Sequence, residues 1–102
     1  MDVKVYNLSP DFARKVLDDI ERYGIVAVDV ENRVSLLDDM LKSDGEKLKY
    51  AREKVREGNV DKAVLVVRDG TGTLVINVEN VVEIRVELRE YGELLREAGV
   101  ME

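Results

Sequence analysis

Histidine, cysteine, tryptophan and glutamine are all absent from this 102-residue chain. Without imidazole or thiol, no side chain titrates near neutral pH unless its pKa is shifted. Neither a thiolate nucleophile nor a zinc site with nitrogen and sulfur ligands can form. The chain also lacks the means to build a disulfide framework. Its chemistry is therefore restricted to carboxylates, hydroxyls, amides and fixed positive charges.

Long apolar runs are missing as well. No stretch approaches the roughly 20 apolar residues that a membrane-spanning helix needs. The first residues show neither the basic region nor the apolar region of a secretion signal. We therefore expect no membrane partner and a cytoplasmic location.

The residues that are present are those of a small folded domain. Hydrophobic residues make up 45% of the chain, and valine is the commonest residue, so a disordered chain is disfavoured. A length of 102 residues suffices for one hydrophobic core, and we expect a single domain over residues 1–102. Abundant Glu, Lys, Arg and Val together with no Gln or Cys is typical of proteins from hot habitats. The alternative is that a short chain lacks a few rare residues by chance.

The charge of the chain argues against one class of partner. A formal net charge of −6 and a pI near 4.8 repel a phosphate backbone, so we do not expect nucleic-acid binding. The densest basic stretch, residues 42–56, is interleaved with acidic residues at helical spacing, which indicates a solvated face with ion pairs inside one helix.

Hydrophobic periodicity and turn signals divide the chain into elements. Alternation predicts a strand over 2–8, and Ser9, Pro10 and Asp11 are typical of a helix start, which gives a helix over 10–23 that ends at Gly24. A second strand follows over 25–30. Residues 34–57 form either one long helix or two, 35–42 and 44–57, because Ser43 with Glu46 has the pattern of a capping box. Strands over 62–68, 73–79 and 82–88 then form a meander, and a short helix ends at Gly99.

This order predicts an α+β fold of two layers. We expect an α/β sandwich with a mixed five-stranded sheet, the order β-α-β-α-α-β-β-β-α along the chain, and helices mainly on one face. The short connections around the first helix predict that the first two strands run parallel through a right-handed crossover. If residues 34–57 count as one helix, the opening order β-α-β-α-β-β also occurs in small nucleic-acid-binding folds such as Alba-type chromatin proteins, but the chain has none of their motifs.

One cluster of polar residues could form a ligand site. If the first two strands are parallel, their carboxyl ends and the helix starts that follow share an edge where such folds bind ligands. Asp29 and Glu31 point the same way on one strand, and their oxygens could hold Mg²⁺ or Ca²⁺. The alternative is that these residues are helix caps and the solvated face of a strand. The candidate ligand-binding residues are Asn7, Ser9, Asp29, Glu31, Asn32, Arg33 and Ser35.

Two functions follow from these patterns. The first is a non-catalytic interaction or assembly module that acts as a homodimer. It rests on an apolar helical seam (Val34, Leu37, Leu41, Leu48 and Val55) and on a strand over 81–88 that could end a sheet. The alternative is a small-ligand or Mg/Ca-binding domain, including a metal-dependent enzyme, that uses the Asp29, Glu31 and Asn32 edge. The absence of His and Cys favours the non-catalytic function.

Overall fold

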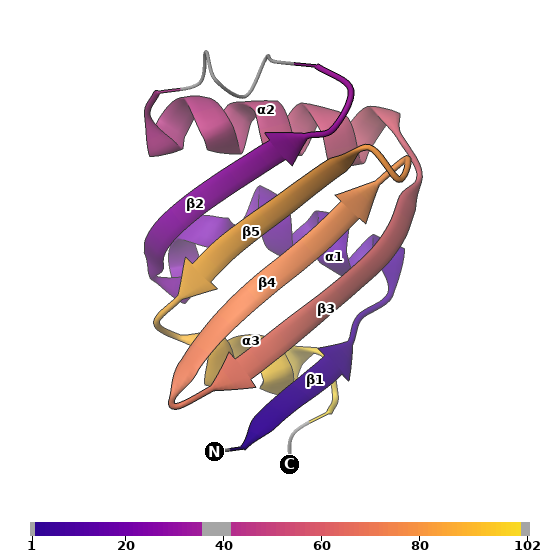
Figure 1. Ribbon diagram of the computed structural model, residues 1–102. Coiled ribbons are helices and arrows are strands. Elements are labelled where there is room, and N and C mark those ends of the chain that lie inside the picture. Colours follow the sequence, from indigo (N-terminus) through magenta and orange to yellow (C-terminus); the bar gives the residue numbers. More distant parts are fainter. Residues whose placement is uncertain (1, 36–41, 101–102) are drawn as a thin grey trace.

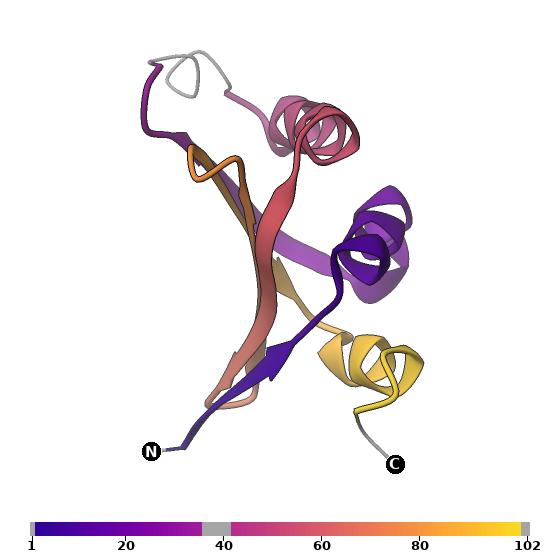
Figure 2. The same cartoon turned by 90° about the vertical axis from the view of Figure 1, so that its right-hand side faces the viewer.

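A computed structural model describes residues 2–35 and 42–100 and shows one antiparallel sheet of five strands with its helices on one face (Figures 1 and 2). The elements are β1 (Val3–Asn7), α1 (Pro10–Asp18), the 3-10 helix η1 (Ile20–Tyr23), β2 (Ile25–Asn32), α2 (Asp44–Glu57), β3 (Val60–Arg68), β4 (Thr71–Val78), β5 (Val82–Leu88) and α3 (Tyr91–Glu97). The predicted α+β class, the two layers and the order of elements are confirmed. The predicted helix over 35–42 falls mostly outside the described residues.

Local sequence signals explain where the helices begin. The Ser9 hydroxyl accepts a hydrogen bond from the Phe12 amide at 3.1 Å, and Pro10 occupies the first turn of α1. Ser43 and Glu46 form the predicted capping box at the start of α2. The predicted helix over 10–23 is divided into α1 and η1, and Gly24 ends it with a left-handed φ of 67°.

The hairpin turns also follow from the sequence. Asp69 and Gly70 both have positive φ, 51° and 77°, and they form a two-residue turn of type I′ between β3 and β4. This turn type matches the twist of antiparallel strands and favours an Asp-Gly pair. Glu79 and Asn80, with φ of 54° and 55°, turn the chain from β4 into β5. The meander predicted for the second half of the chain is therefore confirmed.

The strand order is where the sheet departs from expectation. It is β1-β3-β4-β5-β2, and every neighbouring pair is antiparallel, so the sheet is not mixed. The strands β1 and β2 do run in the same direction, but they form the two opposite edges of the sheet (Figure 1). The crossover through α1 thus spans the whole sheet, and the meander fills the space between. The strand over 81–88, expected at an edge, is β5 and lies inside the sheet.

The hydrophobic core lies between the helices and one face of the sheet. Leu74 and Ile76 from β4 and Ile84 and Val86 from β5 have no exposed surface. Alternation along β5 places Glu83, Arg85 and Glu87 on the opposite face, as predicted. None of the described helices is long and apolar enough to cross a bilayer.

The arginines of α1 and α2 connect the two helices. Arg14 donates from Nε to the Val55 carbonyl at 2.9 Å, and Arg52 donates from Nε to the Leu17 carbonyl at 3.1 Å. Arg52 also pairs with Glu21 at 2.8 Å, and Arg56 pairs with Asp18 at 3.5 Å. The expectation of ion pairs inside one helix is wrong for these two arginines of the basic stretch, because their partners belong to the preceding helical segment.

Candidate functional site

The face of the sheet opposite the helices is not covered by any other element in the described part of the chain. Figure 2 shows all the helices on one side, with the two ends of the sheet bending away from them, so that this open face is concave. Alternation and strand register assign its side chains. In strand order these are Val3, Val5 and Asn7; Lys62, Val64, Val66 and Arg68; Thr71, Thr73, Val75 and Asn77; Glu83, Arg85 and Glu87; and Ala27, Asp29 and Glu31.

The half of the open face around β1 carries a group of valines, bordered by Asn7, Lys62 and Arg68. We call Val3, Val5, Val64, Val66 and Val75 the valine surface; they come from the neighbouring strands β1, β3 and β4. Val64 is only 4% exposed although it is not part of the core beneath the helices, so its neighbours on this face pack closely around it. By contrast, Val3 is 46% exposed and Val5 is 56% exposed. Both lie on the edge strand.

The half of the open face around β2 is charged, and Arg85 is at its centre. Its guanidinium lies 2.6 Å from Asp29, 3.8 Å from Glu31 and in direct contact with Glu83. The hydrogen bond from Arg85 holds the pKa of Asp29 below its usual range, and the same contact raises the pKa of Arg85. Ala27, Thr73 and Glu87 border a hollow of about 270 Å³ beside this pair.

The residues predicted to bind a metal ion lie beside Arg85. Asp29 and Glu31 share a face, as the period of a strand requires, but the positive charge beside them is the guanidinium of Arg85. No group of three or more acidic side chains in the described ranges is arranged to hold a metal ion. A site for Mg²⁺ or Ca²⁺ at these residues stays a prediction, and the geometry gives it no further support.

The predicted site residues separate into two groups. In the register of the sheet, Asn7 lies in the same row as Asp29, but four strand spacings of about 4.8 Å put them roughly 19 Å apart. Ser9 caps α1 on the β1 side. The expectation of one shared cluster was therefore wrong, because it assumed that parallel strands would also be close in the sheet.

The remaining predicted residues belong to the end of β2 and the turn after it. Asn32 donates to the Tyr50 hydroxyl at 2.9 Å and accepts from the Val34 amide at 3.1 Å, so it fastens this turn to α2. Arg33 donates from its backbone to the Val81 carbonyl at 2.9 Å and pairs with Glu83 at 3.6 Å. Ser35 follows Val34 in the same turn and has an interaction partner. The contacts of Asn32 and Arg33 thus join β2 to α2 and β5, a structural role different from the caps and the solvated strand face that were the alternative to a ligand site.

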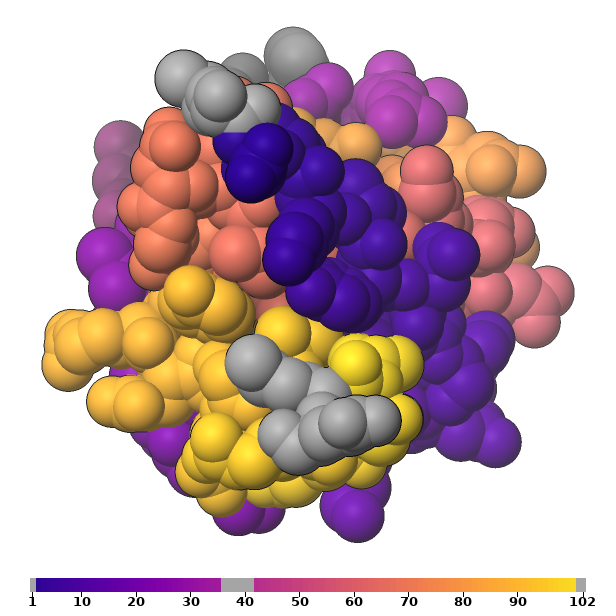
Figure 3. Space-filling model, turned by 90° about the horizontal axis from the view of Figure 1, so that it is seen from below, coloured from indigo at the N-terminus to yellow at the C-terminus, as the bar shows by residue number. Residues whose placement is uncertain are grey.

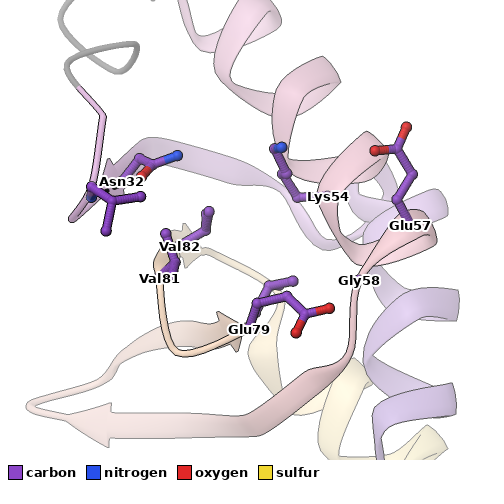
Figure 4. Close-up of a pocket in the computed structure, with 9 residues that line it drawn as sticks. Asn32, Lys54, Glu57, Gly58, Glu79, Val81 and Val82 are labelled. Atoms are coloured by element: carbon purple, nitrogen blue, oxygen red, sulfur yellow. Dashed lines mark hydrogen bonds between the residues drawn. The ribbon is translucent and has the colours of Figure 1, made fainter.

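A hollow of about 370 Å³ lies at this end of the molecule (Figure 4). It is bounded by Lys54, Glu57 and Gly58 of α2 and its end, by the β4–β5 turn, and by Asn32 and Val34. The Lys54 ammonium lies 5.4 Å from the centre of the Tyr50 ring, and Glu79 accepts from the Asn59 amide at 2.9 Å. Lys54 and Glu79 are thus engaged with neighbouring parts of the protein.

Shifted pKa values also occur at Glu21, Arg22 and Tyr23. The Tyr23 ring is buried, and its hydroxyl donates to the Glu97 carboxylate at 2.7 Å. Burial and then this carboxylate raise the pKa of Tyr23 to about 12. The hydroxyl therefore stays protonated at neutral pH and connects η1 to α3, which is a structural role.

No family model, no curated protein and no solved structure matches the chain. The functional assignment therefore rests on the chain's own surface.

Two features of this surface were not predicted from the sequence. The first is Arg85, which lies far along the chain from Asp29; opposite charges at matching positions of two alternating strands were the available signal. The second is the exposure of Val3 and Val5, which depends on β1 being an edge strand. The seam thought to mediate dimerisation is not free: Leu48 and Val55 are buried in the core, Val34 is exposed, and Leu37 and Leu41 lie outside the described residues.

Proposed function

We propose that this protein is a non-catalytic assembly module that forms a homodimer through the β1 side of its open face. The observation that carries the proposal is the exposure of Val3 and Val5, 46% and 56%, on an edge strand whose neighbour β3 adds Val64 and Val66 on the same face. Contiguous exposed apolar surface beside an unpaired strand edge is typical of a protein contact site.

The ionisable groups support binding over catalysis. Each described group with a shifted pKa lies against a partner in the fold: Asp29 against Arg85, Glu21 against Arg52, and both Arg22 and Tyr23 against Glu97. Each shift thus has a partner that stabilises the fold, and none leaves a group ready to exchange a proton near neutral pH.

The size of the surface suggests a reversible dimer. The strand β1 has only five residues, which limits the interface to the small class of protein contacts. We expect a dissociation constant on the order of 10–100 µM. A cytoplasmic location and an origin in a hot habitat fit the composition and are part of this proposal.

The test is a comparison of Val5→Lys with Val26→Lys by analytical ultracentrifugation. Both valines are 56% exposed and lie on edge strands, but Val26 is on β2, at the other edge of the sheet. Lysine at position 5 brings a hydrated ammonium into the proposed contact and should raise the dissociation constant by about 10-fold or more. The control variant should associate like the unmodified protein.

Two results would contradict the proposal. One is a protein that stays monomeric at several hundred micromolar, on the order of ten times the expected dissociation constant. The other is an equal loss of association in both variants, which would show that no contact is specific to the β1 side.

A further inference from the structure

The two edges of the sheet differ in how they are protected. On β2, the register shifts between Ile25 and Ala27, and the Lys47 ammonium donates to the Val28 carbonyl at 3.4 Å. Bulges and charged groups of this kind keep an edge from pairing with another strand. On β1 the register is regular, and no side chain in the described ranges bonds to its backbone. Figure 3 shows the N-terminal residues at the surface, between the β3–β4 hairpin and α3.

The hydrogen bonds of β1 show which backbone groups point away from the sheet. The Leu8 amide donates to the Ala63 carbonyl at 2.9 Å, and these two residues are directly opposite when the register of β1 and β3 is continued. In an antiparallel pair, hydrogen-bonded positions alternate. Lys4 and Tyr6 therefore bond to β3, whereas the N–H and C=O groups of Val3, Val5 and Asn7 point outward.

These outward groups are complementary to a second copy of themselves. We propose, on the basis of the assembly function above, that two copies pair antiparallel along β1 with Val5 opposite Val5 at the two-fold axis. Val3 of each copy is then opposite Asn7 of the other, and all three outward residues form hydrogen-bonded pairs. A shift by two residues would keep only two of these pairs, and a shift by one would oppose outward groups with inward ones.

The side chains fit the same register. On the open face, Val5 lies beside Val5 of the second copy, so the two valine surfaces become continuous across a ten-stranded sheet. On the helix face, Lys4 comes opposite Tyr6 of the second copy, where an ammonium over an aromatic ring is favourable. Neither side chain has a hydrogen-bonding or ion-pair partner within the parts of the chain that the structure describes. No like charges face each other in this pairing.

The register can be tested with single cysteines, since the chain has none of its own. At a hydrogen-bonded antiparallel pair the Cα atoms are about 5.5 Å apart, which a disulfide can span. Val5→Cys should therefore form a disulfide-linked dimer under mild oxidation at high protein concentration. Val3→Cys is the matched control, because Val3 of one copy lies four residues, roughly 14 Å, from Val3 of the other.

We expect Val5→Cys to cross-link on the order of 10-fold faster than Val3→Cys. We also expect a mixture of Val3→Cys and Asn7→Cys chains to form the mixed disulfide in preference to either homodimer. Equal rates for Val5→Cys and Val3→Cys in a protein that still dimerises would overturn this register and leave the assembly function in place. A monomer at all concentrations would overturn both.

Discussion

Replacing Gly72 with alanine is expected to lower the free energy of unfolding by about 2–3 kcal/mol. Gly72 lies on the helix face of β4, opposite Leu88 of β5, and a Cβ atom there would lie 2.4 Å from the Cβ and 2.5 Å from the Cγ of Tyr91. Tyr91 is the first residue of α3, so the helix would have to move away from the sheet. Leu94 and Leu95, which α3 buries in the core, would move with it.

Gly92→Ala is the matched control for this variant, because Gly92 follows Tyr91 in α3 but a Cβ atom there would not meet the sheet. Apart from its chain neighbours and the backbone of α3, the nearest atom to a new Cβ at Gly92 is the Arg96 Nη1, 4.0 Å away, and alanine favours the helical conformation. We expect Gly92→Ala to be neutral or to stabilise by up to about 1 kcal/mol. Chemical denaturation measures both changes. A Gly72→Ala protein as stable as the unmodified one would show that α3 does not pack on β4 as described.

The second large effect on stability is expected from Arg14 and Arg52, because each donates hydrogen bonds from its own helix to the end of the other helix. The last carbonyls of a helix have no partner within it. Arg14 from α1 donates to the Val55 carbonyl in the last turn of α2 and to the carbonyl of Gly58 directly after it, and Arg52 from α2 donates to Leu17 of α1. Hydrogen bonds from a charged donor are stronger than neutral ones, so replacing both arginines with methionine should cost about 2–3 kcal/mol.

Methionine retains the aliphatic part of the side chain, so this loss reports on the hydrogen bonds. Lysine should not restore stability, because it lacks the planar, forked donors of arginine. Arg56→Met serves as the control: Arg56 and Asp18 form an exposed pair at 3.5 Å, which should contribute less than about 0.5 kcal/mol. Thermal or denaturant unfolding measures the stability of each variant. An equal loss of stability in Arg56→Met would mean that charge alone, and not the hydrogen bonds of Arg14 and Arg52 to the helix ends, stabilises the helix pair.

Local features of the fold could be predicted because their causes lie close together in the sequence. The cap at Ser9, the capping box of Ser43 and Glu46, and the Asp69-Gly70 turn each depend on residues within a few positions. The alternation over 82–88 likewise gives the buried and exposed sides of β5 without knowledge of its neighbours.

The strand order could not be predicted in the same way. The handedness of a crossover gives the relative direction of β1 and β2, but it does not determine how many strands lie between them. That number depends on contacts of β3 and β5 with strands far away in the sequence. Since the edge position of β1 depends on this order, the exposure of Val3 and Val5 could not be read from their local pattern.

Only part of the candidate site could be predicted, because the rest also depends on the strand order. The shared face of Asp29 and Glu31 follows from the two-residue period of a strand. Arg85, which contacts these two residues and Glu83, belongs to β5. Its effect on the pKa of Asp29 therefore requires the pairing of β2 with β5. The separation of Asn7 from Asp29 also depends on the full sheet.

Amide hydrogen exchange of the unmodified protein, measured residue by residue at low and high concentration, tests assembly through β1 most directly. In the monomer, the outward amides of Val3, Val5 and Asn7 should exchange quickly, whereas those of Lys4 and Tyr6 should be protected by β3. At high concentration the three outward amides should become protected. On β2 the Arg33–Val81 hydrogen bond sets the same alternation, so the outward amides of Val28 and Val30 should not change. Exchange at Val3, Val5 and Asn7 that is independent of concentration, or new protection on β2 instead, would contradict the account.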